Sequence, residues 1–178
     1  AAFHLAQSNS DATMLVLPAD HVIDDQETFT QAVETAAIAA QHGYLVTFGI
    51  SPHSPETGYG YIKIGDSVEL TKPAQLSIYQ IQSFCEKPQL ETAQAYLQQG
   101  GYLWNSGMFV FTAGNYLQQL QRHRPDIYTA AKQAWQQRTT DLGFVRPNRE
   151  IFTTCPSESI DYAIMQTTDQ AVVVPAQF

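Results

Sequence analysis

The chain has 178 residues, 44% of them hydrophobic, which suits one globular domain with a buried core. Its 9 basic and 17 acidic side chains give a net charge of -8, which disfavours binding to nucleic acid because like charges repel. The two cysteines form no disulfide framework or zinc-binding pattern, and no apolar run suits a membrane span or a signal peptide. We therefore expect a cytoplasmic protein that contacts no membrane.

The first half of the chain predicts a strand, a helix and a second strand. Residues 14–17 form a short apolar run closed by Pro18, which indicates a buried strand of a mostly parallel sheet. Apolar residues recur at helical spacing over residues 26–42, and residues 44–50 form a second β-rich run. This order is typical of a right-handed βαβ crossover and predicts an α/β fold.

The remaining elements continue this alternation. Residues 51–60 hold two prolines and two glycines and predict a loop, and residues 136–150 are polar and predict a flexible surface connection. Helices are expected at residues 91–99 and 113–123, a third helix starts at 126, and a separate short helix ends at 165. Strands are expected at residues 61–64, 76–85, 108–111 and 171–174, and a sharp segment at 104–107 precedes the third of them. The chain starts without Met and as if within a helix, so we expect a truncated protein.

Asp20 is the first candidate site residue, because it directly follows a predicted strand, where open α/β sheets bind ligands. Its carboxylate suits Mg²⁺, which takes oxygen ligands and usually only one or two protein carboxylates. A helix or turn cap explains Asp20 equally well. His21 lacks a second metal-binding residue at suitable spacing and is better explained as a packed residue.

Three further segments hold candidate residues. Gly58 and Tyr59 lie in a glycine-rich stretch whose main chain can approach a ligand closely. Glu86 can accept from sugar hydroxyls, and Lys87 can supply a point charge for a phosphate. Asn105 offers an amide that both donates and accepts, as a sugar diol requires. Ordinary turns and solvated charges also account for each segment alone, so their joint order carries the hypothesis.

Taken together, the segments VLPADHVI, ETGYGYIKIG, FCEKP, WNSGMFVF and PSESIDYAIM resemble successive motifs of the bacterial mannose-1-phosphate guanylyltransferases, including those fused to a mannose-6-phosphate isomerase. The resemblance covers nearly the whole chain. It implies a nucleotide-diphospho-sugar transferase fold, a Rossmann-like mixed sheet flanked by helices. It also implies a reaction in which mannose 1-phosphate and GTP give GDP-mannose and pyrophosphate with Mg²⁺.

The resemblance also implies roles for the candidate residues. Asp20 would be a metal ligand, and the stretch centred on Gly58 and Tyr59 would approach the sugar. Glu86 and Asn105 would hold sugar hydroxyls, and Lys87 would pair with the sugar phosphate, so that positioning and charge neutralisation provide the catalysis. Glu158 and Asp161 lie in the last motif, but a capping or core-supporting role explains them at least as well.

Two departures from the family pattern bear on activity. The glycine-rich signature G-x-G-x-R-x-x-P-L-S, which cradles the nucleotide, is nowhere in residues 1–178, and the chain stops before a W-S-D-V-G segment that holds the other metal ligand. We therefore expect residues 1–178 to form a partial domain, incomplete at both ends and inactive on its own. An oligomer remains open, as do two alternatives: a glucose-1-phosphate thymidylyl- or uridylyltransferase, and a noncatalytic binding domain on the same fold.

Overall fold

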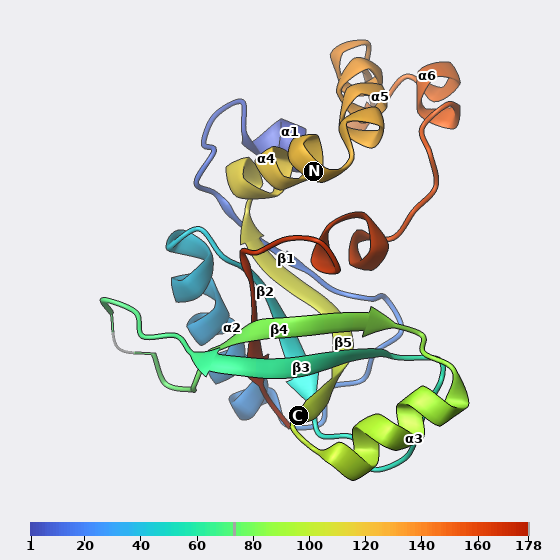
Figure 1. The fold of residues 1–178 in the computed structure, drawn as a ribbon. Helices are drawn as coiled ribbons and strands as arrows, with labels where there is room; N and C mark the ends of the chain where they lie inside the picture. Colours follow the sequence, from blue (N-terminus) through green and yellow to red (C-terminus); the bar gives the residue numbers. More distant parts are fainter. Residues whose placement is uncertain (73, 178) are drawn as a thin grey trace. The chain divides into compact units, whose positions relative to one another are not determined.

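The computed structural model of the chain describes residues 1–72 and 74–177 (Figure 1). These residues form two compact units. The larger unit comprises residues 13–112 and 169–177, and the smaller unit comprises residues 1–12 and 113–168. All six candidate residues, Asp20, Gly58, Tyr59, Glu86, Lys87 and Asn105, belong to the larger unit.

A mixed sheet is the centre of the larger unit. Within its described residues, six strands lie in the order β1-β5-β2-β8-β4-β3. Their bounds are Thr13–Val16 (β1), Leu45–Ile50 (β2), Gly60–Ser67 (β3), Tyr79–Glu86 (β4), Tyr102–Thr112 (β5) and Ala171–Pro175 (β8). Strands β2 and β8 run parallel, and the other pairs are antiparallel. Because β5 also pairs with β3, the sheet curls back on itself.

Strand β1 corrects one expectation. It was expected to be buried in a mostly parallel sheet, but it lies at the edge, antiparallel to β5. Among the described residues, β1 has a partner strand on one side only, and its Leu15 and Val16 are 40% and 38% exposed. Strands β1 and β2 are nevertheless parallel to each other, as the expected βαβ order requires, because each runs antiparallel to β5, which lies between them.

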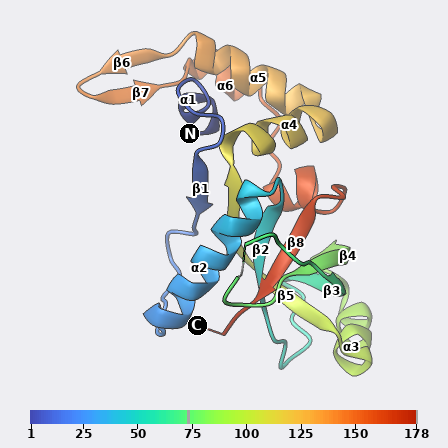
Figure 2. The ribbon, with the colours of Figure 1, turned by 90° about the vertical axis from the view of Figure 1, so that its left-hand side faces the viewer.

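Helix α2 (Gln26–Gln41) covers one face of the sheet, against β5 and β2 (Figure 2). Asp25 caps it by accepting from the main-chain N–H of Thr28 at 3.0 Å. Its small residues allow a close approach to the sheet: four alanines are fully buried against Val46, Phe48, Val110 and Val172. The predicted helix at 26–42 and strand at 44–50 are confirmed.

Strand β5 corrects a second expectation. Residues 104–107 were expected to form a sharp segment before a strand, but β5 continues through them from Tyr102 to Thr112. The irregularity is a bulge within the strand. The pairing with β2 changes from Thr47 opposite Phe109 to Gly49 opposite Asn105, and Gly107 has a φ of 72°. Asn105 therefore lies on a strand, which fixes its main chain.

Helix α3 (Leu90–Gln99) completes the larger unit. Its Ala93 is buried with Tyr61 of β3 and Trp104 of β5. A second apolar cluster fills the curl of the sheet, where Ile62, Leu103 and Val173 meet from three strands. Gly49 permits this packing, because an added Cβ would lie 2.4 Å from Leu103 Cδ1 and 2.8 Å from Val173 Cγ2.

The smaller unit is mostly helical. It contains α1 (Ala2–Leu5), α4 (Ala113–His123), α5 (Pro125–Gln136), α6 (Arg149–Thr153) and the π-helical turn η1 (Asp161–Met165). The expected flexible connection at 136–150 is instead mostly a hairpin of β6 (Thr139–Asp141) and β7 (Phe144–Arg146), whose turn residues Leu142 and Gly143 both have positive φ. In the described part of the chain, no helix combines the length and hydropathy needed to cross a bilayer.

Candidate functional site

Three of the predicted segments meet where β3 begins and β4 ends. Gly60, directly after Gly58 and Tyr59, is paired with Glu86 in the ladder between these strands. A Cβ added to Gly60 would lie 2.5 Å from Glu86 Oε2 and 3.3 Å from the Cβ of Asn105. The glycine-rich loop, the end of β4 and the middle of β5 thus converge on one point.

Glu86 and Lys87 present opposite charges at different depths. The Glu86 side chain is 9% exposed and the Lys87 side chain 58%, with 3.7 Å between Glu86 Oε1 and Lys87 Nζ. Lys87 has a φ of 48°, a left-handed conformation that residues other than glycine rarely adopt. Such strain tends to be retained where the position of a side chain matters.

Asn105 is oriented by a residue that the sequence did not single out. The buried hydroxyl of Thr47 lies 2.7 Å from Asn105 Oδ1 and 3.0 Å from the carbonyl oxygen of Met108, and it can donate to either acceptor. In the sequence, Thr47 is the polar residue of the apolar run YLVTFGI. A buried hydroxyl requires a partner, so this position in the run was the available signal.

Gly58 and Tyr59 lie on the exposed side of the same region. A Cβ at Gly58 would meet nothing within 4 Å, so packing within the protein does not require glycine there. Tyr59 is 49% exposed, and its ring lies edge-to-face against Trp104, with 5.2 Å between centroids. Its carbonyl oxygen accepts a hydrogen bond from the main-chain N–H of Lys87.

No hydrogen bond or ion pair joins Asp20 to this cluster among the described residues. It is exposed in a turn after β1 and has no hydrogen bond or ion pair with residues 1–72 or 74–177. Its segment does approach β5, since Pro18 Cγ lies 3.9 Å from a Cβ built on Gly107. Within the same ranges, no group of three or more His, Cys, Asp or Glu side chains could hold a metal. Asp20 alone fits a Mg²⁺ ion bound mainly by substrate phosphates.

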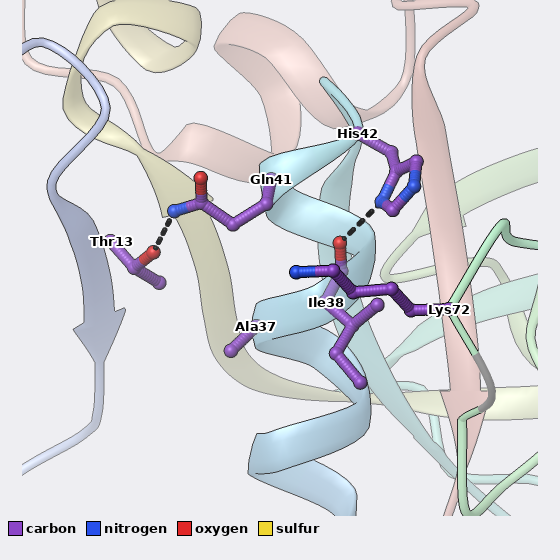
Figure 3. Close-up of a pocket in the computed structure, with 6 residues that line it drawn as sticks. All are labelled: Thr13, Ala37, Ile38, Gln41, His42 and Lys72. Carbon is purple, nitrogen blue, oxygen red and sulfur yellow. Dashed lines mark hydrogen bonds between the residues drawn. The ribbon is translucent and has the colours of Figure 1, made fainter.

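Other polar groups have structural partners. In the smaller unit, Glu158 forms an ion pair with Arg124, which supports a stabilising role. In the larger unit, a hollow of about 200 Å³ lies between α2 and β1 (Figure 3). There, Gln41 Nε2 donates to Thr13 Oγ1 at 2.7 Å, and the imidazole of His42 donates to the carbonyl oxygen of Ile38 at 2.8 Å. The first bond ties α2 to β1, the second lies within the end of α2, and none of the candidate residues lines the hollow.

Comparisons with known proteins agree with this architecture. A family model described as nucleotidyl transferase matches residues 1–149. The mannose-1-phosphate guanylyltransferase of Escherichia coli (strain K12) is 52% identical over 167 residues, which is 93% of this chain and 34% of that protein. The chain thus spans about a third of the length of this relative.

Two solved structures share the fold. Mannose-6-phosphate isomerase from Helicobacter pylori gives a TM-score of 0.84 at 30% identity, over 99% of this chain and 66% of that one. A protein described as mannose-1-phosphate geranyltransferase from Thermus thermophilus gives 0.79 at 32% identity, over 99% of this chain and 48% of that one. The expected α/β class, with a mixed sheet flanked by helices, is confirmed.

Proposed function

We propose a function from one premise: the chain belongs to the nucleotidyl transferase family. In this proposal, its larger unit binds mannose 1-phosphate for reaction with GTP, which yields GDP-mannose and pyrophosphate. The convergence of Gly60, Glu86 and Asn105 carries the proposal, because it gathers sugar-binding groups from three distant segments. Relatives about 50% identical are named mannose-1-phosphate guanylyltransferases, so the thymidylyl- and uridylyltransferase alternatives are not favoured.

In this proposal, the more buried side chains bind the sugar and a more exposed side chain binds the phosphate. The nearly buried carboxylate of Glu86 accepts from sugar hydroxyls, and the amide of Asn105, oriented by Thr47, binds a neighbouring hydroxyl. The more exposed ammonium group of Lys87 pairs with the phosphate. The main chain at Gly58 and Tyr59 approaches the sugar from the open side of the loop.

Positioning is the main contribution to the reaction. Lys87 holds the sugar phosphate so that its oxygen faces the α-phosphorus of GTP, and it neutralises negative charge that would oppose the approach of two phosphates. Asp20 would contribute one carboxylate oxygen to Mg²⁺, with phosphate oxygens as the other main ligands. When bound, Mg²⁺ would withdraw negative charge from the phosphates.

The nucleotide side of the reaction is not assigned to residues of this chain. Its sequence has no G-x-G-x-R-x-x-P-L-S stretch, so we expect residues 1–178 alone to bind mannose 1-phosphate without converting it. The full-length gene product would carry the activity in the cytoplasm.

Calorimetric titration of the chain with mannose 1-phosphate, with and without Mg²⁺, tests this function. We expect Lys87→Ala to weaken binding by at least about tenfold, since it removes a charge-assisted hydrogen bond to phosphate. Lys72→Ala is the matched control, because it removes an equal charge from another loop of the same unit and should leave affinity unchanged. GDP-mannose formation by the full-length gene product should fall with Lys87→Ala alone.

The possible outcomes test the substrate assignment, the proposed function and the site at Lys87 separately. Binding of glucose 1-phosphate in preference to mannose 1-phosphate would overturn the substrate assignment. A chain that binds neither sugar phosphate would overturn the proposed function. Equal losses in the Lys87 and Lys72 variants would show that net charge, and not a site at Lys87, determines affinity.

A further inference from the structure

Trp104 is a buried aromatic residue beside the candidate site that has no role in the proposed chemistry. It lies on β5 directly before Asn105 and is 6% exposed. Its main chain is paired with Ile50 of β2 on one side and with Tyr61 of β3 on the other. Two neighbouring strands therefore fix the base of this side chain, which makes it a rigid support.

The Trp104 ring contacts the glycine-rich loop, residues 53–59, at two points. The ring of His53 lies 4.8 Å away between centroids at 80°, and that of Tyr59 lies 5.2 Å away at 73°. Both are edge-to-face arrangements, which are favourable for aromatic pairs. His53 and Tyr59 precede and follow Gly58, so the two contacts bracket the part of the loop that the proposed function brings to the sugar.

The loop also makes hydrogen bonds, one of which joins it to β4: the main-chain N–H of Lys87 donates to the carbonyl oxygen of Tyr59. Ser54 donates to Glu56 within the loop, and the hydroxyl of Tyr61 lies 3.4 Å from the carbonyl oxygen of Ser54. A Cβ added to Gly58 would meet nothing within 4 Å, so that side of the loop is open. The two contacts with Trp104 join side chains of this loop to β5, in addition to these hydrogen bonds.

The indole N–H of Trp104 shows which property of the side chain matters. It is buried and has no hydrogen-bond acceptor in residues 1–72 and 74–177. A buried donor without an acceptor is unfavourable. The benefit of tryptophan at this position therefore comes from the contacts of its ring, and a ring without the N–H should serve nearly as well.

We propose that Trp104 is a positioning residue that holds the loop of residues 53–59 in the conformation that binds the sugar phosphate. This inference rests on the proposed function. When the ring is removed, the loop samples other conformations, and the apparent affinity falls by the fraction of molecules that remain competent to bind. Trp104 does not touch the reacting atoms. In the full-length gene product, its loss should therefore raise KM for mannose 1-phosphate more than it lowers kcat.

Titration of the chain with mannose 1-phosphate tests this role in two variants. Trp104→Leu keeps an apolar side chain but removes both ring contacts, and we expect the dissociation constant to rise about tenfold. Trp104→Phe keeps a ring and removes the N–H, and we expect a rise of no more than about twofold. Amide hydrogen exchange at residues 53–59 should accelerate in the Leu variant and remain slow in the Phe variant.

Trp135 provides the matched control. It lies in the smaller unit, packs against His4 and Arg138, and also has a buried indole N–H without an acceptor among the described residues. Trp135→Leu should lower the melting temperature without changing the dissociation constant. If Trp104→Leu does not fold, His53→Ala removes one ring contact from an exposed position and should weaken binding by about threefold.

Each result decides between the two roles of Trp104, positioning and packing alone. A wild-type chain that does not bind mannose 1-phosphate overturns the proposed function itself. If the wild type binds and Trp104→Leu, or His53→Ala in its place, binds equally well, the positioning role is wrong. The role is also wrong if Trp104→Phe loses as much affinity as Trp104→Leu, or if Trp135→Leu weakens binding to the same extent.

Discussion

The main-chain N–H of Lys87 donates a hydrogen bond to the carbonyl oxygen of Tyr59 across 3.2 Å. This bond ties the end of β4 to the glycine-rich loop, and it joins the proposed phosphate-binding residue to the proposed sugar-binding loop. The bond continues the ladder that pairs Gly60 with Glu86, and the chain turns after it at Lys87, which has a φ of 48°.

The conformation of Lys87 predicts a difference between two substitutions that remove the same charge. Lys87→Ala keeps the left-handed strain, whereas Lys87→Gly relieves it, so we expect the glycine variant to be more stable than the alanine variant by about 1 kcal/mol. Both should lose affinity for mannose 1-phosphate. Urea unfolding measures the first difference and calorimetry the second. Equal stability of the two variants would show that the main chain at Lys87 relaxes without cost.

Gly60 is predicted to matter for binding more than for stability. In Gly60→Ala, the added Cβ would meet Glu86 Oε2 at 2.5 Å, and this carboxylate can swing away because it is the end of a flexible side chain. The displaced Glu86 would no longer face the sugar. We expect affinity for mannose 1-phosphate to fall at least about tenfold in calorimetry, through loss of a hydrogen bond to a charged acceptor.

Gly65, further along β3, is the control for this prediction. A Cβ there would lie 3.1 Å from the main-chain carbonyl oxygen of Gln80, which cannot move aside as a side chain can. Gly65→Ala should therefore lower the free energy of unfolding by about 1 kcal/mol and leave affinity unchanged. A Gly60→Ala variant that binds normally would remove Glu86 from the proposed site.

The sequence predicted those elements whose stability is local or whose pattern is continuous. Helix α2 has a capping Asp25, a helical apolar period and a glycine just beyond its end, so each local signal agrees. Strands β2 and β8 are almost entirely apolar, with Thr47 as the polar exception in β2, because they lie side by side inside the sheet. The hypothesis that joins the segments of Gly58, Glu86 and Asn105 came from the order of motifs and not from their spacing, and the roles of these residues stay predictions.

Features set by distant partners were not predictable in this way. The apolar run at β1 looks the same whether one or both of its edges are paired, and the structure pairs only one. Gly107 suggested a turn, but pairing with β2 on both sides of the irregularity keeps β5 extended through a bulge. Thr47 was missed because its partner Asn105 is 58 positions away in the sequence.

Gly49 is predicted to be essential for packing inside the curled sheet. A Cβ at this position would lie 2.4 Å from Leu103 Cδ1 and 2.8 Å from Val173 Cγ2, and both of these residues are buried. Overpacking of this kind costs about 1–3 kcal/mol, so Gly49→Ala should lower the free energy of unfolding by that amount in urea titration. Gly49→Ala should lower the free energy of unfolding less in a Leu103→Ala background than in the wild type, because the shortened side chain at position 103 makes room for the added methyl group. An equal loss in both backgrounds would show that the contact with the end of the Leu103 side chain is not the source of the strain.

Asp126 predicts a specific acid sensitivity of the smaller unit. A hydrogen bond from the Arg124 guanidinium lowers the pKa of Asp126 from 3.8 to about 2. Because the folded state favours the ionised form, this group stabilises the fold above its unfolded pKa, and the stabilisation is lost as the pH falls from about 3.8 to about 2. Asp126→Asn should therefore flatten the decline of stability in this range, measured by urea unfolding at successive pH values. Asp66→Asn removes an exposed carboxylate from β3 that has no ion pair among the described residues, and it should leave the decline unchanged. An equally steep decline in Asp126→Asn and the wild type would show that the Arg124 contact does not persist in solution.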